Sequence, residues 1–275
     1  MLTLSTAVSV VILAGARPRL SPAYAARMVE EGAEGTRAVS LALPVSGRWI
    51  ARNSPARRVP SHGTDLLGSR YAIDLVAVDR RRRTAVRRDW RTLLATEPPE
   101  IFLAWGRPIL APADGVVVVA HDGEADHAAR RSPLALVPYL AGQAGRLRRG
   151  VGAIAGNHLI IELREGGAFV ALVHLRAGSI LVAPGAAVTA GQRLADCGNS
   201  GNSTQPHVHV QVMDRPDVST AQGIPLAFRD FFEWPRGVRE PLIRDAGIPG
   251  EGAVVEPIAG EGAVVEPIAG EGEPT

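Results

Sequence analysis

Two histidines one residue apart, His207 and His209, begin an apolar run directly behind the turn-forming residues GNSGNSTQP. If Val208, Val210 and Val212 mark a strand, whose side chains alternate between its two faces, both imidazoles leave from the same face. Neutral imidazole binds Zn²⁺ and also moves protons near neutral pH. Because an ordinary solvated strand face would show the same pair, the rest of the chain has to supply partners for this chemistry.

The turn before the pair does not predict a serine nucleophile. The elbow pattern needs glycine two residues after the serine, whereas Asn202 stands at that place after Ser200. The single cysteine, Cys197, excludes an internal disulfide, and a small buried residue is preferred over a reactive thiol as its interpretation.

Further residues of the right type occur at strand ends. His174 ends the run ALVHL, and His62 lies in the turn-like segment SHGTDLLGSRYAIDLV, which leads into a strand containing Asp74. A zinc hydrolase needs three protein ligands drawn from His and Asp or Glu, a fourth position for water, and a separate group that moves protons. The chain can supply such a set.

The elements that must position these residues are short strands. Helical periodicity is scarce, and β-branched runs bounded by Gly, Pro, Asp or Asn occur at residues 109–123, 156–163, 169–175 and 207–214. Glycine-centred turns recur through residues 182–198, as expected where strands change sheets. The pattern predicts a mainly β fold, an antiparallel β-sandwich with helical or loop inserts at 80–100 and 126–150.

Length and composition allow one core of ordinary size with appendages. The chain has 275 residues, of which 46% are apolar, and its formal net charge of +2 is too small to indicate a nucleic-acid partner. All 30 basic residues are arginine, and several cluster in the two inserts. Such clusters are usually solvated faces; the alternative is a surface that contacts anionic polymers or lipid headgroups.

The N-terminal segment, residues 1–40, contains a candidate signal or leader. Its first 26 residues include an apolar stretch and the small-x-small sequence AYA, but no basic residue precedes the stretch. Export by this segment and retention of an uncleaved segment both stay open. At about 14 residues the stretch is too short to predict a membrane span.

The C-terminal segment, residues 241–275, has low complexity. The decapeptide EGAVVEPIAG occurs at residues 251–260 and again at 261–270. Two copies of an acidic sequence rich in Pro and Gly predict a disordered tail from about Ile248 onward. Residues 41–240 then form the β domain.

From about Leu41 to Trp234 the chain resembles the lysostaphin-type, LytM-like zinc metallopeptidases, which cleave peptidoglycan peptides. The matching segments are SHGTDLLGSRYAIDLV, PILAPADGVVVVA, GNHLIIEL, ALVHLRAGSILVAPGAAVTAGQRLADCGNSGNSTQPHVHVQV and GIPLAF. The segment ending in GNSGNSTQPHVHV is the most specific of them. The resemblance implies a β-sandwich of the duplicated hybrid motif type and a peptidoglycan endopeptidase domain that uses Zn²⁺.

Carried over residue by residue, the resemblance implies that His209 and Asp74 are zinc ligands. It implies that His207 is the general base beside the metal and that His174 hydrogen-bonds the bound water or the developing oxyanion. The glycines before the pair are expected at the lip of a groove, where a peptide backbone comes close.

The third ligand departs from the family's pattern. The family has a histidine four residues before the aspartate, where this chain has Arg70. His62, twelve residues before Asp74, is the nearest upstream candidate and completes the expected ligand set. Asp65 is the competing donor and is interpreted as a turn residue.

Three functions follow as alternatives. The preferred one is a zinc-dependent endopeptidase that hydrolyses peptide bonds of bacterial cell-wall peptidoglycan through a metal-activated water, in the cell envelope or outside the cell. The second is a catalytically inactive wall-binding or hydrolase-activating module of the same fold. The third is a histidine phosphocarrier using His174 and His209, because APADGVV and the following glycine turns also resemble carrier domains. A biotinyl or lipoyl carrier is excluded, since the chain has no lysine.

The bond cleaved, contact with a membrane and the oligomeric state stay open.

Overall fold

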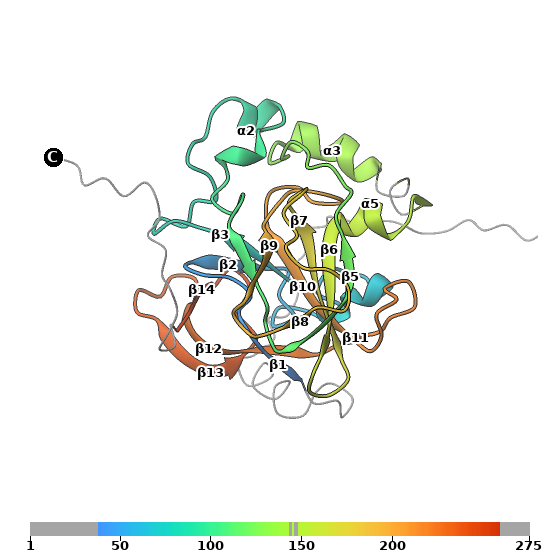
Figure 1. Ribbon diagram of the computed structural model, residues 1–275. Helices are drawn as coiled ribbons and strands as arrows, with labels where there is room; N and C mark the ends of the chain where they lie inside the picture. The colour runs from blue at the N-terminus through green and yellow to red at the C-terminus, as the bar shows by residue number, and fades with distance from the viewer. Residues whose placement is uncertain (1–37, 143–144, 146–147, 259–275) are drawn as a thin grey trace, which may run out of the picture.

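A computed structural model describes residues 38–142, 145 and 148–258 of the chain (Figure 1). Its strands are β1 (Val39–Ala42), β2 (Trp49–Arg52), β3 (Ile73–Ala77), β4 (Pro108–Leu110), β5 (Gly115–His121), β6 (Asn157–Leu163), β7 (Phe169–Leu175), β8 (Ala187–Val188), β9 (Arg193–Asp196), β10 (Val208–Met213), β11 (Gly223–Ile224), β12 (Leu226–Trp234), β13 (Leu242–Gly247) and β14 (Val254–Pro257). Its helices are the 3-10 helices η1 (Leu66–Tyr71) and η2 (Pro99–Ile101) and the α-helices α2 (Arg91–Leu94), α3 (Pro133–Ala141) and α5 (Val151–Ala155). Strands hold 35% of the described residues and helices 13%, so the prediction of a mainly β fold is confirmed.

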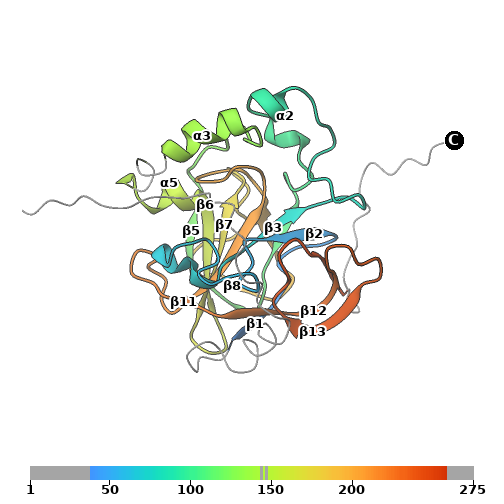
Figure 2. The ribbon, with the colours of Figure 1, turned by 180° about the vertical axis from the view of Figure 1, so that it is seen from behind.

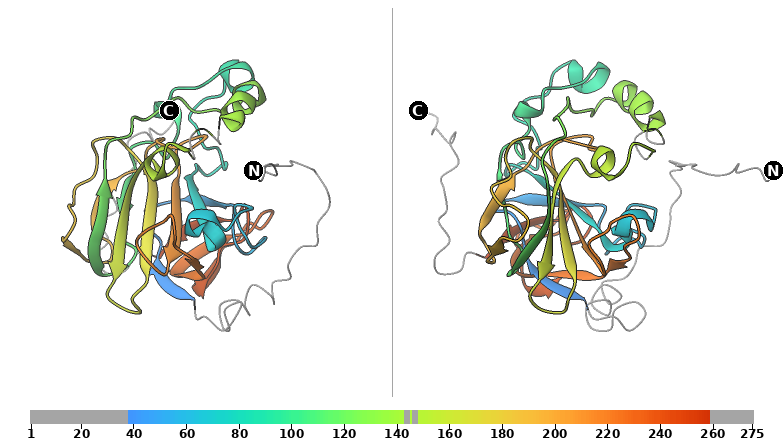
Figure 3. Two further views of the ribbon diagram at one scale, coloured as in Figure 1. Left: turned by 90° about the vertical axis from the view of Figure 1, so that its right-hand side faces the viewer. Right: turned by 45° about the vertical axis from the view of Figure 1, so that its right-hand side comes forward.

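Twelve of these strands form one large sheet. Its order is β1-β12-β14-β2-β3-β10-β7-β6-β5-β8, with β11 beside β10 and β13 beside β12. The pair β1–β12 is parallel, and the other pairings of the described strands are antiparallel. In Figures 1 and 2, β5, β6 and β7 run nearly vertically, whereas β12 and β13 cross at the base of the molecule. Figure 3 shows these two parts of the sheet at a marked angle to each other.

The main core lies between the large sheet and the separate two-stranded sheet of β4 and β9. Its members are apolar, almost completely buried and drawn from nearly every strand, among them Leu41, Trp49, Ile73, Leu75, Ile109, Val117, Leu159, Leu172, Leu194, Val208, Val210, Val212 and Phe228. All three valines that alternate with the paired histidines point into this core. The opposite face of the same strand is therefore available to the histidines.

The two inserts fold against each other at one end of the sheet, where α2 and α3 are neighbours (Figures 1 and 2). The Glu97 carboxylate, 1% exposed, accepts hydrogen bonds from the Arg131 guanidinium at 2.7 Å and from the Thr92 hydroxyl at 2.9 Å. Burial alone would raise the pKa of Glu97, but these hydrogen bonds and the charge of Arg131 lower it. At least one arginine of the inserts thus has a structural partner instead of a solvated position.

Within the described residues, no helix has the length and apolar character needed to cross a bilayer. The candidate signal or leader falls in residues 1–37, outside the part of the chain that is described.

The predicted tail needs a correction. β13 and β14 belong to the large sheet, and β14 pairs with both β12 and β2, so the domain extends past the expected boundary at residue 240. The first copy of the decapeptide contributes β14 because its two valines bury on opposite faces, Val254 at 4% and Val255 at 0% exposure. Its acidic residues have partners at the strand's edges: Glu251 accepts from Ser54 N, and Glu256 pairs with Arg48. The second copy lies outside the described residues.

The burial of Val255 in the core predicts a large contribution of this residue to stability. Val255→Asp should lower the free energy of unfolding by roughly 3–5 kcal/mol, because it places an unpaired charge in the core. Val238→Asp, at a valine that is 45% exposed, is the matched control and should leave stability nearly unchanged. Thermal unfolding of both variants checks this. A melting temperature that Val255→Asp does not lower would contradict the burial of β14 in the core.

Candidate metal centre

Strand pairing brings two of the expected ligands together. β10 pairs antiparallel with β3, and the register sets His209 opposite Asp74. The residues before and after each of them enter the core, so alternation sends both side chains to the other face of the sheet. His209 Nδ1 consequently lies 2.9 Å from Asp74 Oδ1.

The third expected ligand, His62, comes from the loop before β3. Ser61 N donates to Arg70 O at 2.9 Å, which closes the loop and returns its start to the beginning of β3. His62 Nε2 then lies 3.2 Å from each oxygen of the Asp74 carboxylate. One donor atom from each of His62, Asp74 and His209 lies within 4.8 Å of the other two.

Arg70 and Asp65, the other residues considered for this position, contact each other instead. The Arg70 guanidinium pairs with the Asp65 carboxylate at 3.0 Å and lies over the Tyr71 ring. The Asp65 side chain is 57% exposed and is not among the clustered donors. Its position agrees with a turn residue.

The hydrogen bonds around His209 assign its tautomer. Gln211 Nε2 donates to Leu67 O at 2.7 Å, which turns Gln211 Oε1 toward His209 Nε2 at 2.9 Å. That oxygen can only accept, so His209 carries its proton on Nε2, and Nδ1 presents a lone pair. This lone pair faces the Asp74 carboxylate, which is also an acceptor.

The same argument applies to His62. Ser61 Oγ donates to Ser69 O at 3.3 Å and therefore accepts from His62 Nδ1 at 3.0 Å. His62 Nε2 is left as a lone pair toward Asp74. Two imidazole lone pairs and one carboxylate thus meet without a proton between them, which is unfavourable unless a cation or an added proton is present. The donor set fits Zn²⁺, which takes histidine nitrogen and carboxylate oxygen and keeps a fourth position free in catalytic sites.

The Asp74 carboxylate is 7% exposed and stays ionised. Burial acts to raise the pKa of this carboxyl. The charges that His62 and His207 carry when protonated, and the hydrogen bonds that protonated His209 and His62 donate, hold the pKa well below its ordinary value. Burial likewise opposes the charged form of His209, whereas the hydrogen bond and charge of Asp74 raise the pKa of that imidazole. Asn53 Nδ2 donates to the second carboxylate oxygen at 2.6 Å and fixes its orientation.

His207 lies beside this group on the same face as His209. Its Nδ1 donates to Gln205 O at 2.8 Å, which leaves the Nε2 lone pair 3.6 Å from Asp74 Oδ1. Burial lowers the pKa of His207, so the imidazole is neutral at pH 7.

His174 reaches the site through an irregularity in β7. The pairing of β6 with β7 skips it, since Asn157 pairs with Leu175 and His158 with Val173, and its φ of 65° lies in the left-handed region. Such a bulge re-aims a side chain. The His174 ring centroid lies 4.7 Å from that of His207, and Nδ1 donates to Ser200 O at 2.9 Å. Burial, then the charges of His207 and His209, holds the pKa of His174 well below its ordinary value.

The structure therefore places all five sequence-predicted residues together: His62, Asp74, His174, His207 and His209. Sequence reasoning missed Asn53 and Gln211. The position of Gln211, two residues after His209 on the same strand face, was a usable signal. The sequence contains no comparable signal for Asn53, because this residue follows β2 in a turn far from any motif.

The glycines before the histidine pair pack closely against other segments of the protein. A Cβ added to Gly201 would lie 2.3 Å from Gly156 N, and one added to Gly198 would lie 2.4 Å from the Arg176 backbone. Both glycines are thus required for close packing of the turn on its own protein. Ser200 Oγ donates to Leu175 O and accepts from Asn157 N, which are structural contacts.

Cys197 is completely buried. Burial, more than the neighbouring charges, raises the pKa of its thiol, so the thiolate does not form at neutral pH. This agrees with a small buried residue.

Comparison with known proteins identifies one segment. The model of peptidase family M23 matches residues 138–221, which contain His174, His207 and His209, and this confirms the resemblance found in the sequence. No curated protein matches the chain.

Similar solved structures include the catalytic domain of the antimicrobial peptidase lysostaphin from Staphylococcus simulans, at 20% identity over 58% of this chain and 80% of that chain, with a TM-score of 0.32. A mutant catalytic domain of the prophage-encoded M23 protein EnpA from Enterococcus faecalis is 19% identical over 56% of this chain and 73% of that chain (TM-score 0.32). A zinc-containing peptidase from Vibrio cholerae is 21% identical over 51% of this chain and 43% of that chain (TM-score 0.26).

The contact between Gln211 and His209 gives a prediction about metal affinity. Gln211→Met removes the acceptor that orients His209 and sets its tautomer, so the affinity for Zn²⁺ should fall about 10–100-fold. Competition with a chromogenic chelator measures it. Gln222→Met, at an exposed glutamine, is the matched control and should keep the affinity of the unchanged protein. Equal affinities in all three proteins would exclude this role for Gln211.

Proposed function

We propose that this protein is a zinc-dependent endopeptidase that hydrolyses peptide bonds in bacterial cell-wall peptidoglycan. The family match supports a peptidase of this group. The observation that carries the proposal is the convergence of three lone-pair donors, from His62, Asp74 and His209, beside two neutral imidazoles with free Nε2 atoms. A peptidase of this type acts on the cell wall, so we further propose that the protein works in the cell envelope or outside the cell.

The imidazoles of His207 and His174 have distinct tasks in the proposed reaction. Zn²⁺ held by His62, Asp74 and His209 would supply a water whose pKa is lowered to about 7 and would polarise the scissile carbonyl. His207 Nε2 accepts the proton of the attacking water and passes it to the leaving amine. Gln205 O holds His207 Nδ1–H and so keeps Nε2 free for this transfer.

His174 acts first as an acceptor. Its Nδ1–H is donated to Ser200 O, and its lowered pKa keeps Nε2 unprotonated. It can therefore orient the attacking water by accepting its hydrogen bond. It can donate to a developing oxyanion only after it has gained a proton itself.

The alternative functions have less support. A phosphocarrier that uses His174 and His209 needs a free nitrogen on each: His174 has one at Nε2, but both nitrogens of His209 have partners, Asp74 and Gln211. This function would also leave the convergence of His62 and His207 on Asp74 without a role. An inactive wall-binding module of the same fold would share the ligands, so metal content and turnover have to be measured separately.

Variants at the ligands test the metal site. His62→Ala and His209→Ala should both lose zinc and activity, because a site reduced to two protein ligands binds metal far more weakly. Asp65→Ala, three residues after His62, should keep both. Metal analysis of the purified proteins, together with release of new amino termini from peptidoglycan, decides the matter. Full zinc in His62→Ala would mean that another residue is the third ligand.

A variant at His207 tests proton transfer separately. His207→Ala should keep its zinc but lose turnover by about 10² to 10⁴-fold, since it removes only the general base. Retained turnover in this variant would exclude His207 as the base. Zinc-loaded unchanged protein that releases no amino termini would favour the inactive wall-binding module.

A further inference from the structure

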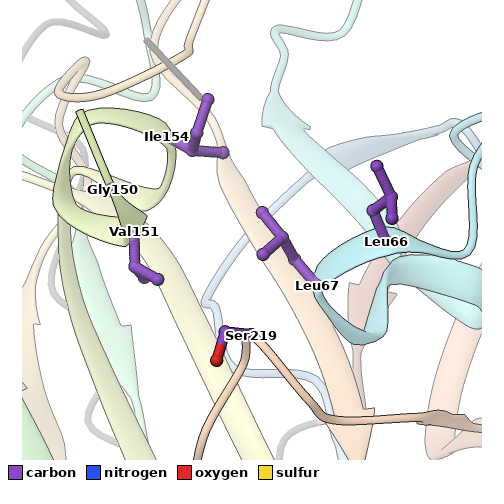
Figure 4. Close-up of a pocket in the computed structure, with 6 residues that line it drawn as sticks. All are labelled: Leu66, Leu67, Gly150, Val151, Ile154 and Ser219. Carbon is purple, nitrogen blue, oxygen red and sulfur yellow. The ribbon is translucent and has the colours of Figure 1, made fainter. Parts of the chain in front are cut away.

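An apolar pocket lies between η1 and α5 (Figure 4). It has a volume of about 250 Å³, and its lining residues come from three separate segments: Leu66 and Leu67 of η1, Gly150, Val151 and Ile154 around α5, and Ser219 between β10 and β11. Figure 4 shows the Leu67 side chain directed across the pocket toward Ile154. Among these residues, Ser219 supplies the sole polar side chain.

The pocket is connected to the metal centre through Leu67. The Leu67 carbonyl accepts the hydrogen bond of Gln211 Nε2, and Gln211 Oε1 accepts that of His209 Nε2. Two hydrogen bonds therefore separate a wall of the pocket from an expected zinc ligand. A peptide that is bound at the metal and extends over η1 would carry one of its side chains to this wall.

The backbone of Leu67 is unusual for a leucine. Its φ of 59° and ψ of 27° lie in the left-handed region, where Gly or Asn is favoured and a leucine costs free energy. In this conformation the Leu67 carbonyl accepts from Gln211 Nε2, but the conformation does not explain the apolar side chain. A costly residue of this kind at a site is consistent with a functional requirement for its side chain.

The size and lining of the pocket define what it can hold. Pockets for drug-sized ligands have volumes of about 300–1,000 Å³, so this one is suited to a single side chain. A charged side chain would lose its hydration without a counter-charge among the lining residues. Glycine has no side chain to fill it.

We propose that this pocket receives an apolar side chain of the peptide substrate close to the scissile bond. The protein then selects peptides that carry alanine or a larger apolar residue at that position over glycine-only bridges. This inference rests on the proposed function. One added carbon group in an apolar pocket discriminates by about 10–200-fold, and we expect a preference of this size.

Peptide binding tests the inference independently of turnover. Calorimetry on the zinc-loaded protein compares tetraglycine with tetrapeptides in which one glycine at a time is replaced by alanine, valine or aspartate. At one position, alanine or valine should tighten binding at least about 10-fold, and aspartate should not. Equal affinity for all peptides would overturn the proposal.

Variants locate the preference in the pocket. Leu67→Asn keeps the left-handed backbone and the carbonyl to Gln211 but removes the apolar wall, and Val151→Ser removes the opposite wall. Both should lose the apolar preference while keeping zinc and the affinity for tetraglycine. Leu181→Asn, at a leucine that is 63% exposed outside the pocket, is the matched control and should keep the preference. Preference retained in both pocket variants would overturn the proposal.

The two proposals fail in different ways. Selective binding of apolar peptides without release of amino termini would leave the pocket assignment standing and overturn the peptidase. Cleavage of all peptides at equal rates and with equal affinity would overturn only the pocket assignment.

Discussion

The charge of the buried Asp74 carboxylate has to be offset by its neighbours, and strand register decides which neighbours it has. A buried ionised carboxylate without hydrogen bonds or counter-charge would cost far more than one contact contributes to stability. Pairing of β3 with β10 supplies His209, the closed loop supplies His62, and the end of β2 supplies Asn53. A shift of the register by one residue would turn Asp74 or His209 into the core, so the metal centre and the apolar core specify the same alignment.

Backbone conformations outside the regular strand geometry provide the rest of the site. The left-handed residue His174 interrupts the alternation of β7, so that an imidazole joins the site face while Leu175 returns to the core. Leu67, also left-handed, aims its carbonyl at Gln211. Both positions cost conformational free energy in the folded chain, and the packed sheet around them has to supply it.

Much of this arrangement follows from local sequence pattern, and the rest depends on contacts between distant segments. The alternation of valine and histidine from 207 to 212 predicted the two faces of β10, because side-chain direction in a strand depends on position alone. The bulge at His174 and the contact of Asn53 with Asp74 depend on which strands pair, which no short motif encodes. The first copy of the C-terminal decapeptide was predicted to be disordered, because its acidic residues and its Pro and Gly content are typical of disordered segments. Its two consecutive valines are nevertheless enough to form a strand, since they are buried on opposite faces of the sheet.

The single cysteine has a consequence for how such a domain is made. Since Cys197 is enclosed in the core and has no second cysteine to join, no covalent cross-link contributes to the native state. Stability then comes from packing, hydrogen bonds and any bound ion, and is the same in reducing and oxidising surroundings. The fold described therefore forms without any thiol oxidation, and a reducing agent added during purification leaves it unchanged.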